Sequence, residues 1–214
     1  MPHQKDENAA SRRRPVHGNI NPRELRALGL DPDDLLDFSA SISPIGPPEG
    51  VWEAIRNVDL SAYPDPECLE LREAICRHLS TPSRKVPLER VLVGNGSTEI
   101  IHLLARAYLT DRAGGGSVLL LTPTYGEYEG ACRLAEAKVV NFEADLSGDF
   151  QWDIDAASSI IRTNKPGLVF VCNPNNPTGV YLERRQIEAL ADAASDADSL
   201  LVVDEAYLSF VAKP

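Results

Sequence analysis

Short apolar runs and amphipathic stretches alternate from residue 90 of this 214-residue chain onward. The apolar runs predict short strands at residues 91–93, 118–121, 139–142, 168–171 and 200–203. The stretches between them predict helices near residues 97–109, 125–136, 153–162 and 183–194. Repeated strand–helix units build a mainly parallel sheet that is covered on both faces. We therefore predict an α/β fold, a three-layer sandwich around a mainly parallel sheet.

The first part of the chain is organised differently. Residues 1–16 are polar and predict a disordered tail, in which the basic cluster Arg12–Arg14 is best explained as a solvated arm. A short helix is expected at about 23–28, where Asn21 can act as the cap and Gly29 as the end. Further helices are expected at about 49–57 and 67–79, separated by proline-rich turns.

The composition excludes several classes of protein. Lys and Arg total 21 against 32 Asp and Glu, a formal charge of −11, which argues against nucleic-acid binding. No apolar run reaches membrane-spanning length and no signal peptide opens the chain, so neither a membrane protein nor an exported one is expected. The four cysteines and four histidines show no metal-ligand spacing. Reduced thiols in a cytoplasmic protein without a metal site are the simplest account.

A proline- and asparagine-rich segment, 172–179, directly follows the apolar run 168–171. Proline removes backbone donors and biases the preceding residue toward extended conformations, so neither strand nor helix can continue here. Asn and Gly favour a tight turn. The sequence predicts a rigid loop at the carboxyl end of a strand, with an amide side chain aimed outward. That edge is where open α/β sheets bind ligands.

Gly94–Glu99 follows the first predicted strand and opens a helix. Small residues there let backbone N–H groups and a hydroxyl approach an anion, for which a phosphate is the natural guest. The motif matches neither a dinucleotide fingerprint, because Glu99 stands where Gly or Ala is expected, nor a P-loop, because GK[ST] is missing. Taken alone, the motif is better explained as a plain Gly turn with a Ser or Thr cap.

Two other predicted strand ends carry candidate side chains. Asp204 ends the run 200–203 and needs a partner if it is buried, such as an arginine or a cationic heterocycle. Tyr207 follows closely and can point into the same pocket. Tyr125 follows 118–121 and can stack on a flat ring. A solvated acid and a packing tyrosine remain the alternatives. Together, these signals fit a phosphorylated aromatic cofactor with a basic ring nitrogen.

The order of these motifs resembles the class I and II aminotransferases of fold type I, which bind pyridoxal phosphate (PLP). The residues that carry the resemblance are Gly94–Glu99, Pro123–Tyr125, Asn173–Gly179 and Asp204–Tyr207. The chain is most similar to the branch shared by threonine-phosphate decarboxylase and histidinol-phosphate aminotransferase. The resemblance implies a decarboxylase acting on L-threonine phosphate in cobalamin biosynthesis, or alternatively an aminotransferase of the histidinol-phosphate type.

The resemblance also implies roles for individual residues. It assigns the cofactor phosphate to Gly96, Ser97 and Thr98, and stacking on the pyridine ring to Tyr125. Asn176 and Tyr207 would bind the phenolic oxygen, and Asp204 would pair with the ring nitrogen, which makes the ring an electron sink. Tyr63 matches a tyrosine that reaches the cofactor phosphate of a neighbouring subunit, so a homodimer is implied.

The family pattern is matched only in part. The lysine that bonds the cofactor is expected some distance after Asp204, and no lysine of this chain matches it. Residues 17–60 would be an N-terminal arm, and 61–214 a large PLP-binding domain that stops before this lysine and before a C-terminal small domain. A catalytically incomplete fragment is therefore the alternative to an enzyme. Ser41 and Ser43 also stand where the family's N-terminal loop carries Asn.

Overall fold

The computed structural model of the protein describes residues 20–110 and 116–212. By their contacts, the described residues form two compact units that divide between Val93 and Gly94. Each unit is considered by itself below. The disordered tail predicted for 1–16 lies outside the described residues, and the domain boundary predicted at residue 60 stays a prediction.

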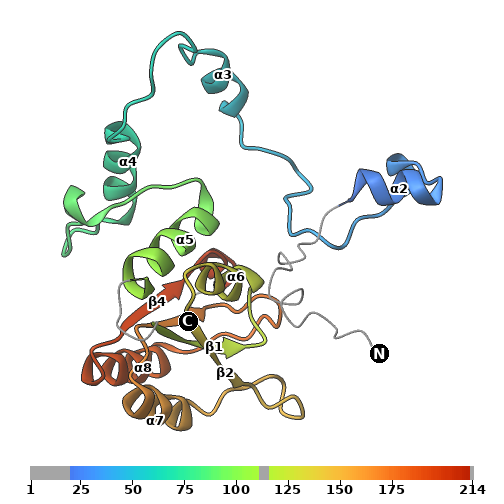
Figure 1. The fold of residues 1–214 in the computed structure, drawn as a ribbon. Coiled ribbons are helices and arrows are strands. Elements are labelled where there is room, and N and C mark those ends of the chain that lie inside the picture. Colours follow the sequence, from blue (N-terminus) through green and yellow to red (C-terminus); the bar gives the residue numbers. More distant parts are fainter. Residues whose placement is uncertain (1–19, 111–115, 213–214) are drawn as a thin grey trace. The chain divides into compact units, whose positions relative to one another are not determined.

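A parallel sheet forms the middle of the unit that begins at Gly94 (Figure 1). In the described residues its strands are β1 (Ser117–Thr122), β2 (Lys138–Glu143), β3 (Leu168–Cys172) and β4 (Leu200–Asp204), in the spatial order β2-β1-β3-β4. All the pairs are parallel, as predicted. Parallel strands need crossover connections, and the intervening helices supply them.

Helices cover both faces of this sheet (Figure 1). Residues of α5 (Gly96–Leu109) and α6 (Gly126–Leu134) share one hydrophobic core with one face. Residues of α7 (Ile154–Asn164) and α8 (Arg184–Asp196) share a second core with the other face. The predicted three-layer α/β sandwich is confirmed.

Alternation along the strands decides which residues enter which core. Leu120 and Phe170 belong to the α5–α6 core, whereas Leu121 and Val171 belong to the α7–α8 core. Successive side chains of a strand point to opposite faces, so a run that is apolar throughout is buried on both sides. β3 accordingly has every residue buried. These continuous runs explain why the strands could be located from the sequence.

Local signals start the outer helices. The Asp153 carboxylate accepts the N–H of Ala156 at 2.9 Å and caps α7. Glu183 and Gln186 form a capping box at the start of α8, each side chain bonding the backbone of the other. Such caps satisfy backbone donors that have no partner inside the helix. They fix where the chain turns back toward the next strand.

In the described residues of the unit that precedes Gly94, short helices alternate with long irregular segments. Its elements are α2 (Pro22–Leu28), η1 (Pro32–Asp34), α3 (Val51–Arg56), α4 (Leu69–Leu79) and η2 (Leu88–Arg90). The predicted cap of α2 is confirmed, because the Asn21 side chain accepts the N–H groups of Arg23 and Glu24. In residues 20–110 and 116–212, no helix combines the length and apolar character that crossing a membrane requires.

The strand predicted at 91–93 is wrong. Val91 has an extended backbone, but no strand of the described residues pairs with this segment. The Val91 carbonyl instead accepts the Arg72 Nε–H at 2.9 Å, and Arg72 also donates to the Leu88 carbonyl at 2.9 Å. A side chain from α4 therefore satisfies a carbonyl that a neighbouring strand would otherwise take. Hydrophobicity predicted the extended conformation and not the pairing.

Candidate functional site

The carboxyl ends of β1, β3 and β4 meet at one edge of the sheet. Cys172 and Asp204 are in register at the ends of β3 and β4. The Asn173 N–H donates to the Asp204 carbonyl at 2.8 Å, so pairing continues one step beyond the strands. Since the strands are parallel and adjacent, the segments that follow them start side by side. This edge holds the predicted loop, the predicted carboxylate and the predicted stacking tyrosine.

Two buried asparagines hold the 173–179 loop in place. The Asn173 side chain donates to the Leu182 carbonyl at 3.0 Å and accepts the Leu182 N–H at 2.8 Å. The Asn175 amide donates to the Pro123 carbonyl at 2.9 Å, and its oxygen accepts the Thr124 hydroxyl at 2.9 Å. The first asparagine fastens the loop to the chain that leaves it, and the second fastens it to the end of β1.

Asn176 has a different environment from these two neighbours. Asn173 and Asn175 are 5% and 3% exposed, whereas Asn176 is half-buried. Within the described part of the chain, no hydrogen bond is made by the Asn176 side-chain amide, although its backbone N–H bonds the Cys172 thiol. The loop is thus built by its other asparagines. Asn176 is the one whose amide remains available to a ligand.

Asp204 is held at both carboxylate oxygens. The hydroxyl of Tyr128 donates to Oδ2 at 2.8 Å, and the backbone N–H of Ala206 donates to Oδ1 at 3.0 Å. The residue is half-buried at the end of β4. Each carboxylate oxygen can accept more than one hydrogen bond. Capacity therefore remains for a cationic donor, and the predicted alternative of a merely solvated acid does not describe this environment.

Aromatic rings pack together beside this carboxylate. Tyr128 is fully buried and stacks on Phe170 with ring centroids 4.9 Å apart and planes inclined by 10°. Tyr125 meets Tyr128 edge to face at 5.7 Å and 84°. Such offset and perpendicular contacts are the favourable geometries for aromatic pairs. Tyr125, half-buried at the start of α6, is thus fixed in orientation at the edge of the sheet.

The first turn of α5 carries the residues of the predicted anion cup. Gly96 has φ +76°, and a Cβ there would meet nothing within 4 Å. No side chain caps the helix, and Ser97 and Thr98 are exposed. Helix N-terminal N–H groups without a cap attract an anion. Glu99 Oε2 folds back onto the Asn95 N–H at 2.6 Å, so this acid is already bonded beside the turn.

One contact brings the cup to the aromatic cluster. Thr98 Oγ1 lies 3.3 Å from the Tyr125 hydroxyl. The cup, the ring and, through Tyr128, the carboxylate are therefore parts of one connected site. Tyr207 is half-buried just after Asp204, and its ring lies 6.3 Å from that of Phe210. Tyr63 belongs to the unit before Gly94, where its side chain is 100% exposed.

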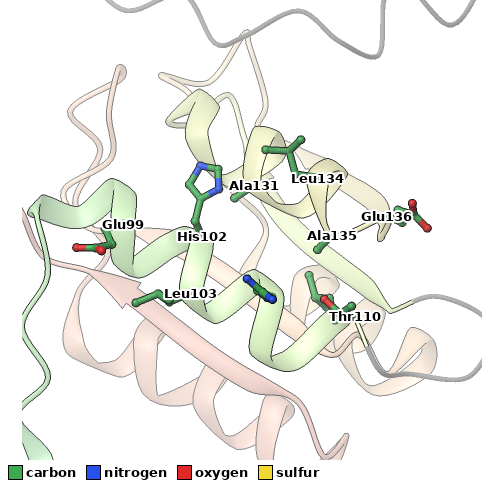
Figure 2. Close-up of a pocket in the computed structure, with 10 residues that line it drawn as sticks. Glu99, His102, Leu103, Thr110, Ala131, Leu134, Ala135 and Glu136 are labelled. Carbon is green, nitrogen blue, oxygen red and sulfur yellow. The ribbon is translucent and has the colours of Figure 1, made fainter.

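A separate groove of about 740 Å³ lies between α5 and α6 (Figure 2). His102 stands between the two helices, and its Nε2 lies 3.3 Å from Oε2 of the buried Glu127. The groove runs from Glu99, in the first turn of α5, to Thr110 and Glu136 beyond the ends of the helices. None of the predicted site residues lines it. The C-terminal ends of α5 and α6, which border much of the groove, lie toward the amino ends of the parallel strands and away from their carboxyl ends.

Comparison with known proteins decides the family. Residues 33–214 match the family model for "Aminotransferase class I and II". The chain belongs to the class I and II aminotransferases. The match begins within the unit that precedes Gly94 and includes all the motifs at the carboxyl edge of the sheet.

Individual aminotransferase-family relatives agree in fold and sequence. The chain is 34% identical over 200 residues to threonine-phosphate decarboxylase of Salmonella typhimurium, covering 92% of this chain and 51% of that protein. Histidinol-phosphate aminotransferase of Clostridium acetobutylicum superposes with a TM-score of 0.68 at 27% identity, covering 84% of this chain and 50% of that one.

A further solved relative shows the same fold with a ligand. Histidinol-phosphate aminotransferase of Sinorhizobium meliloti, solved in complex with pyridoxal phosphate, superposes with a TM-score of 0.74 at 24% identity. That match covers 91% of this chain and 50% of the other. The chain thus spans about half the length of the relatives it matches.

Sequence reasoning missed several residues of this candidate site. Tyr128 lies in the first turn of α6, three positions after the N-cap residue Tyr125, and that spacing was the available signal. Asn173 and Asn175 were seen as part of a rigid loop, but nothing in the sequence distinguishes them from Asn176. Thr124 gave no signal, because its partner Asn175 lies 51 residues away.

Proposed function

We propose that the whole protein is a PLP-dependent enzyme that acts on a phosphorylated amino substrate, in the manner of threonine-phosphate decarboxylase. One observation carries the proposal: the Asp204 carboxylate, held at both oxygens, shares one connected site with the Tyr125 ring and the uncapped first turn of α5. A charged acid, a flat ring and an anion cup are the three complements of PLP. The match to the aminotransferase family supports the same cofactor.

The residues present fit this cofactor in their donor and acceptor chemistry. Gly96, Ser97 and Thr98 supply backbone donors and exposed hydroxyls for the phosphate. Asp204 supplies an acceptor for a protonated ring nitrogen, and Asn176 supplies an amide donor for the ring oxygen. Among the described residues, no atom apart from those of Gly96, its two chain neighbours and the backbone of its own helix comes within 4 Å of the place where a Cβ of Gly96 would stand, so the space beside this backbone is open. We assign these roles, with Tyr207 as a second donor to the ring oxygen, as parts of the proposal.

The bound cofactor would supply an electron sink for bond breaking at the substrate α-carbon. The chain's own part is binding and orientation. Thr98 and Tyr125 hold one another at the phosphate end of the site, and Asp204 offers negative charge at the other end. Keeping a proton on the ring nitrogen requires that this carboxylate stay ionised and in place. The packed rings around Tyr128 exclude water from its inner side.

The choice between decarboxylation and amino transfer is a proposal about the whole protein. The 34% identity to threonine-phosphate decarboxylase favours decarboxylation of L-threonine phosphate, which would place the enzyme in cobalamin biosynthesis. The structural similarity to histidinol-phosphate aminotransferase favours the second candidate. Both reactions begin with a phosphorylated amino compound. They differ in which bond at the α-carbon is broken.

The experiment compares the two reactions in the full-length protein loaded with PLP. We expect carbon dioxide release from L-threonine phosphate, and little transfer of the amino group from histidinol phosphate to α-ketoglutarate. An Asp204→Asn variant should lose activity on either substrate while keeping its fold by circular dichroism. Amino transfer alone would overturn the decarboxylase assignment. Bound PLP without turnover of either substrate would instead favour a non-catalytic cofactor-binding protein.

We also propose that the protein works as a homodimer in the cytoplasm, with residues 17–60 as an arm and 61–214 as part of the large domain. The fully exposed Tyr63 side chain supports the dimer, because it is available to a partner subunit. The four free thiols support the cytoplasmic location, because thiols stay reduced there. Tyr63 is assigned to the cofactor phosphate of the partner subunit. A Tyr63→Phe variant should bind PLP more weakly and phosphate-free pyridoxal unchanged. A monomeric mass by light scattering would contradict the proposal.

A further inference from the structure

Tyr128 is a tyrosine whose hydroxyl is placed deep in the protein. Its side chain is 0% exposed in the α5–α6 core, among residues that are otherwise apolar. A buried hydroxyl is costly unless it is hydrogen-bonded. Its hydroxyl meets this need by donating to Asp204 Oδ2 at 2.8 Å, over a separation of 76 residues. A phenylalanine would satisfy the packing alone, so the hydroxyl itself requires an explanation.

The ring of Tyr128 is held on two sides. Phe170 of β3 stacks on its face at 4.9 Å, and Tyr125 meets it edge to face at 5.7 Å. A ring fixed in this way delivers its hydroxyl to one point. The contact therefore orients Asp204 rather than following it, because the half-buried end of β4 is less tightly packed than the fully buried Tyr128.

The second oxygen of Asp204 is fixed independently. The Ala206 N–H donates to Oδ1 from the turn that follows β4. Two donors at two different oxygens define the plane of the carboxylate, whereas one donor would leave it free to rotate. A charge-assisted hydrogen bond is stronger than a neutral one, so this orientation is well held.

We propose that Tyr128 is a positioning residue that acts through Asp204, setting the carboxylate in the orientation that receives the ring nitrogen of the cofactor. This inference rests on the proposed function and adds a residue to its site. Tyr128 has no direct contact with the cofactor in this assignment. Its influence reaches the ring nitrogen only by way of the carboxylate.

The protonation state of the Tyr128 phenol is consistent with its role as a permanent hydrogen-bond donor to Asp204. Burial raises the pKa of its phenol far above the usual value, and the nearby Cys172 thiol and Asp204 carboxylate raise it further. Burial also raises the pKa of the Cys172 thiol. The phenol therefore keeps its proton throughout the working range of an enzyme. It donates to the carboxylate under all of those conditions and does not exchange protons with it.

The test uses the full-length protein with Tyr128→Phe, which removes only the hydroxyl. Tyr108→Phe is the matched control, because Tyr108 is a partly exposed tyrosine of α5 with no role in the site. Two quantities are measured for each: PLP affinity by absorbance titration, and the nitrogen NMR shift of ring-labelled PLP. We expect roughly tenfold weaker PLP binding for Tyr128→Phe, in line with loss of a hydrogen bond to a charged group. The ring-nitrogen resonance should move toward its unprotonated position.

A double-mutant cycle with Asp204→Asn isolates the pathway. If Tyr128 acts through the carboxylate, its removal should change little once Asp204 is neutral, so the two effects should be strongly non-additive. p-Aminophenylalanine at position 128 keeps a donor at the same place and should restore the resonance. Circular dichroism of each variant without PLP checks the fold, so a loss of packing cannot pass for a loss of positioning.

Each outcome has a distinct meaning. Additive effects, or an unchanged ring-nitrogen resonance in Tyr128→Phe, would overturn the assignment of Tyr128. A wild-type protein that binds no PLP would overturn the proposed function instead. An equal change in the Tyr108→Phe control would show a general response to tyrosine replacement, and would also count against the positioning role.

Discussion

The hydroxyl of Tyr125 lies 3.3 Å from Oγ1 of Thr98 and joins the end of β1 to the first turn of α5. The two residues are 27 positions apart and belong to motifs that the sequence presents separately. Their contact turns an uncapped helix start and a ring into adjacent walls of one site. Of these two residues, Thr98 belongs to the proposed cup, so phosphate binding and the position of the Tyr125 ring are coupled through it.

The cup should discriminate for phosphate. In the full-length protein, Thr98→Val keeps the side-chain shape but loses the hydroxyl, and we expect about tenfold weaker binding of PLP. Phosphate-free pyridoxal should bind nearly as it does to the unmodified protein, since it makes no use of the cup. Absorbance titration with both compounds gives the comparison. Thr163→Val, on the exposed face of α7, is the control. Equal losses for the two compounds would refute phosphate binding by Thr98.

The asparagines of the loop should separate stability from binding. Asn173→Ala leaves the N–H and carbonyl of Leu182 without their partner in a buried setting, which should cost about 2–4 kcal/mol of unfolding free energy. Asn176→Ala should cost little stability, because its amide has no partner in the described residues, but it should weaken PLP binding. Urea unfolding and absorbance titration of both variants check this. A large loss of stability in Asn176→Ala, or weakened PLP binding with unchanged stability in Asn173→Ala, would contradict this assignment.

Buried thiols should make the protein sensitive to alkali. Burial raises the pKa of Cys132 to about 12, above the ordinary thiol value. Because the folded state holds this proton more tightly than the unfolded state, the stabilisation is complete below the ordinary thiol pKa. It is lost as pH rises toward the folded value. The free energy of unfolding should therefore fall less between neutral pH and about pH 10 in Cys132→Ala than in the unmodified protein. Urea midpoints at the two pH values measure this, and Cys76→Ala, at a half-buried position, is the control.

Much of the sheet was predictable because its signal is local. The runs that became β1 and β3 are apolar at nearly every position, and a strand covered on both faces requires that pattern. The segment 91–93 has the same pattern but lacks a strand partner in the described residues. Pairing depends on what else is present, which a local run of residues does not report.

The candidate site was predictable only in part, for a related reason. Asp204 directly follows one apolar run and Tyr125 comes four residues after another, so their placement near the strand ends could be inferred from chain order. Tyr128 was missed because a buried tyrosine on an amphipathic helix has the same sequence pattern as a packing residue. Its function depends on Phe170 and Asp204, which are remote in sequence and meet it only when the sheet forms.

Trp152 should report the folding of the sheet. It is 6% exposed, and its indole N–H donates to the Thr122 carbonyl at 3.1 Å, at the end of β1. Trp52, in α3, is 61% exposed. Unfolding should therefore shift the emission of Trp152 strongly to the red, and Trp52→Phe should keep that shift. Trp152→Phe should abolish most of it and destabilise the protein by about 1–3 kcal/mol, through the lost hydrogen bond and packing. A full red shift in the Trp152→Phe variant would show that Trp52 is the buried reporter and would contradict the burial of Trp152.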